Sequence, residues 1–243
     1  MGKSFLLVGG SSDIGLRLAT MLLDEGHDVT LLARDAERVN QLVAKGAVLV
    51  QGDALDEDTV QAAVATASEA GENGLSGMAH LVGSIALRPP HATKLEDFQS
   101  VLQTNLVSAF LALKTAGKAM LKLGQGRMVF TSSVAGSYGL TNHEAIAAAK
   151  GGIEAMVRSA ASTYAGRGLR VNAVAPGLTE TRLGATVLRS DAIREASVGM
   201  IPLKRINEPE EIAQSMHWLL TDAPDNLTGQ IIHLDGGMSA LRG

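Results

Sequence analysis

Short apolar runs alternate along the chain with segments of helical periodicity. The runs are hydrophobic at every position rather than at every second one, which is typical of strands covered on both faces. They occupy Phe5–Val8, Val29–Ala33, Ala47–Val50, Ala79–Val82, Met128–Phe130, Val171–Val174 and Ile231–Leu234. Segments with a helical repeat lie between them, at 14–26, 56–71, 95–120 and 142–168. This alternation predicts an α/β fold with a doubly wound, mostly parallel sheet of seven strands, helices on both faces and right-handed crossovers.

Composition narrows the class of protein. The 243 residues contain no linker rich in proline, serine or charge, which favours one domain over residues 1–243. A net charge of −4 gives no reason to expect nucleic acid or an anionic membrane as a partner. The absence of cysteine excludes disulfides, thiolate metal sites and cysteine nucleophiles, and the histidines show no metal-ligand spacing, so we expect no metal. No apolar run approaches the roughly 18 residues of a membrane span, so we expect a cytoplasmic protein.

A glycine-rich turn follows the first apolar run. In an open parallel sheet, ligands bind beyond the carboxyl ends of the strands, so the residues after each run are candidates for chemistry. The sequence "GGSSDIG", Gly9 to Gly15, joins the first predicted strand to a helix. Such a turn lets the backbone approach a pyrophosphate closely and points the free N–H groups of the helix start toward it. The turn therefore predicts a dinucleotide site.

The spacing in this turn resembles the G-x-x-x-G-x-G motif of the short-chain dehydrogenase/reductase family. Gly9 and Gly15 occupy the outer glycine positions, and Asp13 stands at the middle one. A carboxylate beside a diphosphate would repel it, so we expect Asp13 or Ser12 to cap the helix with its side chain turned from the phosphates. The resemblance implies a Rossmann fold that binds NAD or NADP. It also implies cofactor contacts from Gly9, Ser11, Ser12, Ile14 and Gly15.

Arg34 bears on the choice between NAD and NADP. At the end of the second strand, an acid would bind the ribose 2′-OH and a base would bind a 2′-phosphate. This chain has Ala33 followed by Arg34, and a guanidinium can hold a phosphate through two hydrogen bonds. We therefore expect NADP. The alternative is a solvated arginine paired with Asp35 or Glu37.

Further motifs of the family follow in order along nearly the whole chain. "GRMVFTSSVAG" matches the strand that ends in the active-site serine, at Ser133, and "TNL" matches the helical asparagine, at Asn105. Gly83 ends the motif that is Asn-Asn-Ala-Gly in the family, although its first three residues are replaced by those at 80–82. The resemblance implies additional cofactor contacts from Asp53, Ala54, Gly83, Lys150, Pro176, Gly177, Thr179 and Thr181.

The family's catalytic tyrosine is missing. In the family, a serine and a tyrosine hold the substrate carbonyl, and a lysine four residues after the tyrosine binds the ribose and lowers the pKa of the phenol. Here Lys150 is present, but Ile146 stands four residues before it and thirteen after Ser133. Isoleucine transfers no proton, and general acid–base catalysis typically contributes ~10²–10⁴-fold.

His143 is one candidate to replace the phenol. On a helix, His143, Ile146 and Lys150 fall on one face. Thr141 and Glu144 have the spacing of a capping box, which places His143 in the first turn, where the helix dipole disfavours imidazolium. A neutral imidazole there still polarises a carbonyl by donating a hydrogen bond. The alternative is a structural histidine bonded to a loop carbonyl.

Other polar residues each have two interpretations. Tyr138, five residues after Ser133, is the second candidate donor or else a pocket-wall or surface aromatic. Ser133 orients a substrate oxygen or serves as a strand-end turn serine. Asn105 holds a relay water with Lys150, as the resemblance implies, or satisfies backbone groups at a helix irregularity.

The last third of the chain suggests a cover over the site. The segment 183–205 mixes Leu, Val, Ile and Met with scattered charges and resembles the family's substrate lid. By analogy with the family, we expect a homodimer or homotetramer. Three hypotheses remain. The first is an NADP(H)-dependent oxidoreductase acting on a small carbonyl or alcohol with an unusual proton donor, and the second is a non-catalytic protein that binds the nucleotide as a structural or regulatory ligand. The third is a lyase or isomerase on the same scaffold, since a fold does not fix the reaction.

Overall fold

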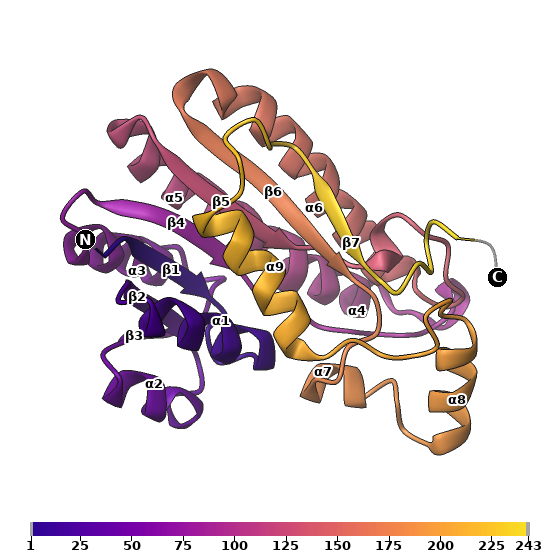
Figure 1. The fold of residues 1–243 in the computed structure, drawn as a ribbon. Coiled ribbons are helices and arrows are strands. Elements are labelled where there is room, and N and C mark those ends of the chain that lie inside the picture. Colours follow the sequence, from indigo (N-terminus) through magenta and orange to yellow (C-terminus); the bar gives the residue numbers. More distant parts are fainter. Residues whose placement is uncertain (1, 242–243) are drawn as a thin grey trace.

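Seven parallel strands form one sheet at the centre of the molecule. The computed structural model describes residues 2–241. The strands lie in the order β3-β2-β1-β4-β5-β6-β7, and every pairing is parallel (Figure 1). Their bounds are β1 Ser4–Val8, β2 Asp28–Ala33, β3 Val48–Gln51, β4 Leu75–His80, β5 Gly126–Thr131, β6 Leu169–Pro176 and β7 Ile231–Leu234. The predicted α/β fold with a doubly wound parallel sheet is confirmed.

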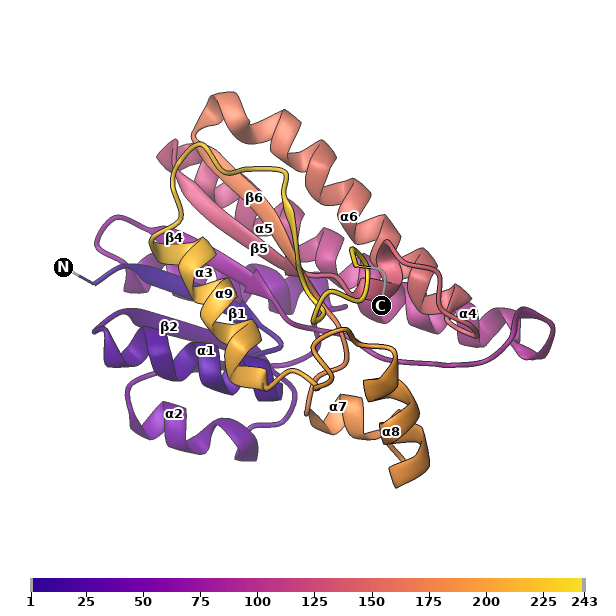
Figure 2. The same cartoon turned by 45° about the vertical axis from the view of Figure 1, so that its right-hand side comes forward.

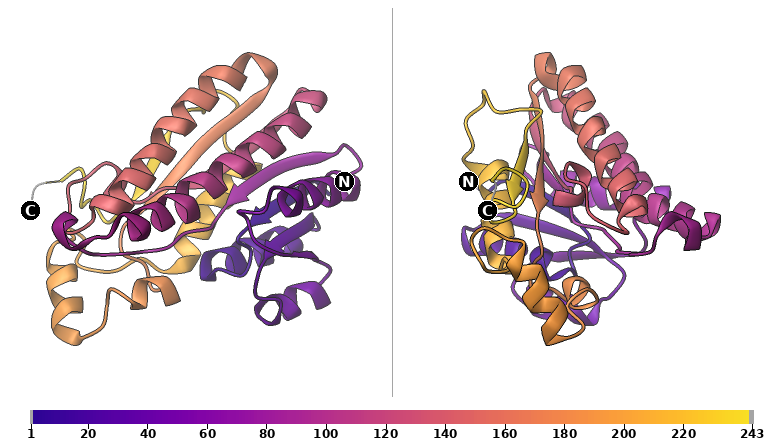
Figure 3. Two further views of the ribbon diagram at one scale, coloured as in Figure 1. Left: turned by 180° about the vertical axis from the view of Figure 1, so that it is seen from behind. Right: turned by 90° about the vertical axis from the view of Figure 1, so that its right-hand side faces the viewer.

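Helices cover both faces of this sheet. They are α1 Asp13–Asp24, α2 Asn40–Ala44, α3 Glu57–Ala70, α4 Leu95–Leu102, α5 Ser108–Leu123, α6 Glu144–Tyr164, α7 Arg182–Ala185, α8 Asp191–Gly199 and α9 Pro209–Thr221. Helices α1, α2 and α9 pack with one face, and α3, α5 and α6 pack with the other (Figures 1 and 3). Side chains of the strands alternate between these two cores, which is why the strands are apolar at every position.

The fourth strand lies earlier in the chain than its apolar run predicted. The run Ala79–Val82 indicated a strand there, but β4 spans Leu75–His80. Gly77 is tolerated inside the strand because Phe5 and Leu220 fill the space beside it. The two residues after His80 instead form the start of the connection that borders the site. A hydrophobic run thus located the strand but misplaced its ends by several residues.

The predicted long helix 95–120 is interrupted by a π-helical turn. This turn, Gln103–Val107, lies between α4 and α5. It contains Asn105, which is fully buried and donates from Nδ2 to the carbonyl of Val101 at 2.9 Å. Wider turns of this kind leave the backbone with altered hydrogen bonds, and they often mark functional sites.

The order of the strands places a crevice at one end of the sheet. From β1 the chain moves outward to β2 and β3, and then returns to pair β4 on the other side of β1. At such a switch point, the connections after neighbouring strands diverge and leave room for a ligand. Helices α7 and α8 project over the same end of the sheet (Figure 2).

Candidate active site

A cavity of about 670 Å³ lies beyond the carboxyl ends of the strands. All but one of the residues predicted to bind the cofactor line it, together with the predicted catalytic residues Asn105, Ser133, His143 and Lys150. They are Gly9, Ser11, Ser12, Ile14, Arg34, Asp53, Ala54, Gly83, Asn105, Ser133, His143, Lys150, Pro176, Gly177, Thr179 and Thr181. The exception is Gly15, which lies beneath the glycine turn, where an added Cβ would come within 2.8 Å of the Gly10 carbonyl oxygen. Gly15 therefore allows the turn to pack rather than lining the cavity.

The glycine turn brings backbone to the wall of the cavity. Gly9 has a φ of 87°, and a Cβ there would lie 2.9 Å from the amide nitrogen of Val82. Only glycine fits this conformation at this distance. Ser12 caps α1 by accepting a hydrogen bond from the amide of Gly15 at 3.1 Å, which is one of the two expected caps. The remaining amides of the first turn stay available to an anion.

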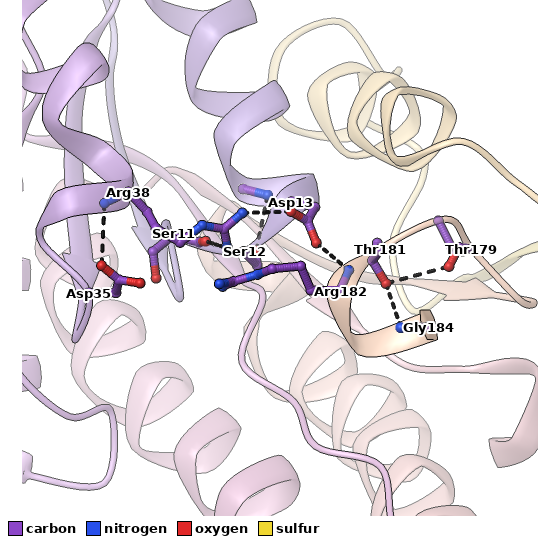
Figure 4. A network of polar contacts seen from close by, with 10 residues as sticks. Ser11, Ser12, Asp13, Asp35, Arg38, Thr179, Thr181, Arg182 and Gly184 are labelled. Atoms are coloured by element: carbon purple, nitrogen blue, oxygen red, sulfur yellow. Dashed lines mark hydrogen bonds and ion pairs between the residues drawn. The ribbon is translucent and has the colours of Figure 1, made fainter. Parts of the chain in front are cut away.

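Asp13, the other residue offered as a cap, has a different role. Its Oδ1 accepts from Nη2 of Arg38 at 2.7 Å, and its Oδ2 accepts from the amide of Arg182 at 2.8 Å (Figure 4). Partial burial acts to raise the pKa of Asp13, but these two bonds outweigh it and hold the pKa below its ordinary value. The carboxylate that stands at the family's glycine position is thus neutralised by its neighbours rather than turned into a helix cap.

Two arginines reach the cavity near this turn. The side chain of Arg34 is 77% exposed, and its Nη1 lies 3.6 Å from Oδ2 of Asp53. Its partner is therefore Asp53 and not Asp35 or Glu37. The side chain of Arg38 is only 19% exposed, and it donates to the carbonyl of Ser11 as well as to Asp13. The sequence did not single out Arg38, because its partners are 25 and 27 residues away and no local pattern connects them.

Lys150 and Ser133 lie at the other end of the cavity. The ammonium of Lys150 donates to the carbonyl of Thr131 at 2.8 Å, and burial lowers the pKa of Lys150 to about 8. Ser133 caps a short 3₁₀ turn by accepting from the amide of Ala135 at 3.2 Å. Both interpretations of Ser133 are compatible, since a hydroxyl that accepts from one amide still has a proton to donate to an oxygen in the cavity.

Asn105 connects the π-helical turn to the wall of the cavity. Besides the carbonyl of Val101, it bonds Ser84, whose amide donates to Oδ1 at 3.2 Å. A Cβ at Gly83 would lie 3.3 Å from Oδ1 of Asn105 and 3.6 Å from Nζ of Lys150. Asn105 therefore satisfies backbone groups at a helix irregularity while standing beside Gly83 and lining the cavity.

Ile146, the residue predicted to stand in place of the family's tyrosine, presents only hydrocarbon to the cavity. It lies on α6, is 4% exposed, and belongs to a small apolar cluster with Val101, Ala135 and Ala149. The same side chain borders the cavity that Ser133 and Lys150 line. Ile146 therefore offers no group that could transfer a proton.

His143 also lines the cavity, but its surroundings differ from those predicted. The expected capping box of Thr141 and Glu144 is wrong: α6 begins at Glu144, and His143 is itself the N-cap residue, with no side-chain cap bond. Its Nδ1 lies 2.8 Å from the carbonyl oxygen of Thr141. A carbonyl oxygen only accepts, so Nδ1 carries a proton, and in the neutral ring Nε2 is then a bare acceptor. Neutral His143 consequently cannot polarise a carbonyl by donating from Nε2.

The second candidate donor lies away from the cavity. Tyr138 is 42% exposed and does not belong to the cavity lining. Its position corresponds to the surface aromatic that we considered as the alternative.

Residues after β6 and in the lid close the remaining side. Thr181 accepts from the amide of Gly184 at 2.9 Å and so begins α7 at Arg182. Beyond it, the cavity lining is rich in apolar side chains from several connections and short helices. They include Ile85, Val134, Leu140, Leu183, Val187, Met200, Ile201 and Met238. The charged cavity residues other than His143 and Lys150 lie at the opposite end, namely Asp13, Arg34, Arg38, Asp53 and Arg182.

His80 is a buried polar residue whose surroundings sequence patterns did not reveal. It ends β4, and its Nε2 lies 2.9 Å from Oγ of Ser108 on α5. Burial, with a smaller contribution from the charge of Lys150, lowers the pKa of His80 to about 3. The ring is therefore neutral at ordinary pH, and it stands where the family's motif has its first asparagine.

Membrane-spanning helices and metal-binding clusters are both absent from residues 2–241. None of the helices in this range is both long and apolar enough to cross a membrane. In the same range, no three His, Asp or Glu side chains lie close enough together to hold a metal ion.

Known proteins resemble this chain over nearly its full length. A family model described as enoyl-(acyl carrier protein) reductase matches residues 9–239. The chain is 34% identical to 2-(S)-hydroxypropyl-CoM dehydrogenase 3 of Xanthobacter autotrophicus, over 97% of this chain and 96% of that protein. It is 33% identical to the inactive 2-(S)-hydroxypropyl-CoM dehydrogenase 2 of the same organism, over 92% of this chain and all of that protein. A crystal structure of actinorhodin polyketide ketoreductase with NADPH superposes with a TM-score of 0.91 at 25% identity, covering 99% of this chain and all of that one.

Proposed function

Because the chain belongs to the short-chain dehydrogenase/reductase family of oxidoreductases, we propose that it transfers a hydride between NADP(H) and a small, uncharged carbonyl or alcohol. One observation carries the proposal. The glycine turn at one end and the pair Ser133 and Lys150 at the other open into the same cavity. A cofactor-binding end and a chemically competent end are thus parts of one site.

The residues present fit a dinucleotide. Gly9 has no room for a Cβ, so the backbone forms the cavity wall where a pyrophosphate would lie against the start of α1. Three arginines, Arg34, Arg38 and Arg182, line this end and outnumber its two carboxylates, which supports NADP over NAD. Lys150 would bind ribose hydroxyls through Nζ. When bound, the nicotinamide supplies or accepts the hydride.

The apolar end of the cavity favours an apolar substrate. Leu140, Val187 and Met200 would surround the part of the substrate beyond its carbonyl, and an apolar group would lose less hydration against them than a charged one. Ser133 would donate its hydroxyl proton to the substrate oxygen and so fix the position of the carbonyl.

His143 is the proposed proton-transfer group. Its neutral form has Nδ1–H bonded to the carbonyl of Thr141, and Nε2 is free to accept. His143 therefore acts as a base toward an alcohol, and it acts as an acid toward a carbonyl only after protonation.

Binding and turnover are tested separately. NADPH is titrated by its own fluorescence, since Trp218, the sole tryptophan, lies on α9 outside the cavity lining. Oxidation of a panel of small apolar alcohols with NADP⁺ is then followed at 340 nm. We expect His143→Phe to lower kcat by ~10²-fold or more, and Tyr138→Phe, the matched control, to leave it unchanged. Binding without turnover on any alcohol or carbonyl would refute the enzymatic proposal.

A second candidate function is nucleotide binding without catalysis. Ile146 supports it, because it replaces the hydroxyl of the family with a packed hydrocarbon. One relative, 33% identical to this chain, is named an inactive dehydrogenase. Loss of the reaction therefore has a precedent among similar proteins. An Ile146→Tyr variant distinguishes the two functions: turnover that appears only in this variant supports a degenerate site, and turnover already present in the wild type refutes it.

The proposal includes self-association. Phe110 on α5 is 52% exposed, so this helix leaves a large apolar side chain at the surface. We propose that a homodimer or homotetramer covers it. Sedimentation equilibrium tests this, and a monomer at all accessible concentrations would contradict it.

A further inference from the structure

A carboxylate joins two parts of the site that the chain separates by more than 140 residues. Asp13 lies in the first turn of α1, Arg38 follows β2, and Arg182 is the first residue of α7. One oxygen of Asp13 holds the guanidinium of Arg38 and the other holds the backbone amide of Arg182 (Figure 4). Both bonds are charge-assisted, and both lie beside the glycine turn.

Arg38 is fixed at this turn, whereas Arg34 is not. The guanidinium of Arg38 donates to Asp13 and to the carbonyl of Ser11. These two bonds use only two of its five N–H groups. Its backbone amide also donates to Oδ1 of Asp35 at 3.3 Å. Arg34 is mostly exposed, and its contact with Asp53 is a surface pair of little strength. An arginine that is already ordered loses less conformational entropy when it binds an anion.

The amide of Arg182 is where the lid begins. Thr181 caps α7 by accepting from the amide of Gly184, so the start of α7 is hydrogen-bonded on both sides of Arg182. Glu180, one residue before this cap, forms a bidentate pair with Arg194 on α8. The hydrogen bond from the amide of Arg182 to Asp13 therefore positions the start of α7, and the pair between Glu180 and Arg194 connects this region to α8.

We propose that Asp13 couples the lid to cofactor selection: it positions Arg38, rather than Arg34, to receive the 2′-phosphate of NADP(H), and it fastens the start of α7 to the glycine turn. This inference rests on the proposed NADP(H) function. Asp13, which departs from the family's glycine motif, would thus be a positioning residue at both the phosphate end of the cavity and the lid.

Cofactor selection is tested by equilibrium binding. Dissociation constants for NADPH and NADH are measured for the wild type, Arg38→Leu, Arg34→Leu as the matched control, and Asp13→Ala. We expect Arg38→Leu to weaken NADPH by ~10-fold or more with NADH little changed, as expected for loss of hydrogen bonds to a charged group. Arg34→Leu should weaken NADPH by less than ~3-fold, and Asp13→Ala should fall between the two.

Attachment of the lid is tested without any ligand. Arg182→Pro removes the N–H that Asp13 accepts, and proline is well tolerated at the first helical position. The preceding Thr181 has φ −126° and ψ 163°, which suits a residue before proline. Arg182→Ala is the matched control, because it removes the side chain and keeps the N–H. Hydrogen exchange in peptides covering 183–188 should accelerate several-fold in Asp13→Ala and Arg182→Pro, and should stay unchanged in Arg182→Ala.

The outcomes separate this inference from the function on which it rests. If the wild type binds no NADPH, both are overturned. If NADPH binds but Arg34→Leu removes the selectivity and Arg38→Leu does not, only the inference is overturned. Unchanged hydrogen exchange in residues 183–188 of Asp13→Ala also overturns the inference. The inference is supported if Asp13→Ala loses both selectivity for NADPH and protection of residues 183–188, while Arg182→Pro loses only the protection.

Discussion

Replacement of Lys150 by methionine should abolish a distinctive pH dependence of stability. The ammonium of Lys150 is buried among the cavity wall residues, with the carbonyl of Thr131 as its hydrogen-bond acceptor. Burial lowers the pKa of Lys150 from 10.5 to about 8, so the folded chain binds this proton less tightly than the unfolded chain does. Stability therefore rises with pH between about 8 and 10.5, because in this window the unfolded state holds more protons.

The size of this effect follows from the two pKa values. Each pKa unit corresponds to about 1.4 kcal/mol, so the free energy of unfolding should gain about 3 kcal/mol from Lys150 between pH 7 and pH 10.5. Other lysines and tyrosines also titrate at high pH, but they do so in both proteins. The difference in the free energy of unfolding between the wild type and Lys150→Met therefore reports the titration of Lys150 alone. Loss of the hydrogen bond to Thr131 adds a contribution that does not change with pH.

Urea denaturation followed by far-ultraviolet circular dichroism measures this difference. Unfolding curves are recorded for both proteins at half-unit intervals from pH 7 to pH 10.5, without cofactor. We expect the wild type to gain stability relative to Lys150→Met as pH rises. If the difference in the free energy of unfolding between the two proteins varies by less than about 1 kcal/mol over this pH range, the conclusion that burial destabilises the Lys150 ammonium is refuted.

Three further predictions concern stability. His80→Asn should remove an acid sensitivity: the pKa of His80 is about 3 in the fold, so the wild type should lose about 3 kcal/mol relative to the variant between pH 7 and pH 4, as urea titrations at the two pH values will show. Gly9→Ala should destabilise by about 2–4 kcal/mol through its positive φ and its 2.9 Å approach to Val82, and an unchanged midpoint would contradict the reported geometry. Asn105→Leu should cost about 2–4 kcal/mol, because it leaves the carbonyl of Val101 and the amide of Ser84 without partners, and Asn105→Asp, which retains an acceptor for Ser84, should lose less in the same assay.

The sequence predicted the fold well because the relevant signals are local and repeated. Apolar runs and turn glycines located each strand, and the order of motifs indicated which strand ends face the site. Boundaries were less accurate: β4 ends before the predicted run does, since periodicity cannot separate the last strand residues from an apolar connection. The capping box predicted for Thr141 failed because the backbone turns through a left-handed Asn142, with φ 63°, and the helix starts later.

Long-range pairing accounts for most of what the sequence did not predict in the site. Nothing near Asp13 in the sequence indicates Arg38 or Arg182, so its carboxylate was interpreted as a local cap. Likewise, the carbonyl of Thr141 fixes which nitrogen of His143 carries the proton, and this reverses the expected direction of its hydrogen bond toward a substrate. Residue identity suggested the candidates, but only the fold determined their protonation and partners.

The span of the cavity has a consequence for the life of the protein in the cell. Its wall includes residues from Gly9 to Met238, so no partial chain on the ribosome has the complete site. Until β7, Ile231–Leu234, has emerged and paired with β6, the outer edge of β6 is free, and a strand of another chain can pair with it. A ligand that binds the finished cavity stabilises only completed chains by mass action. The cellular level of that ligand should therefore set how much of this protein escapes aggregation and proteolysis.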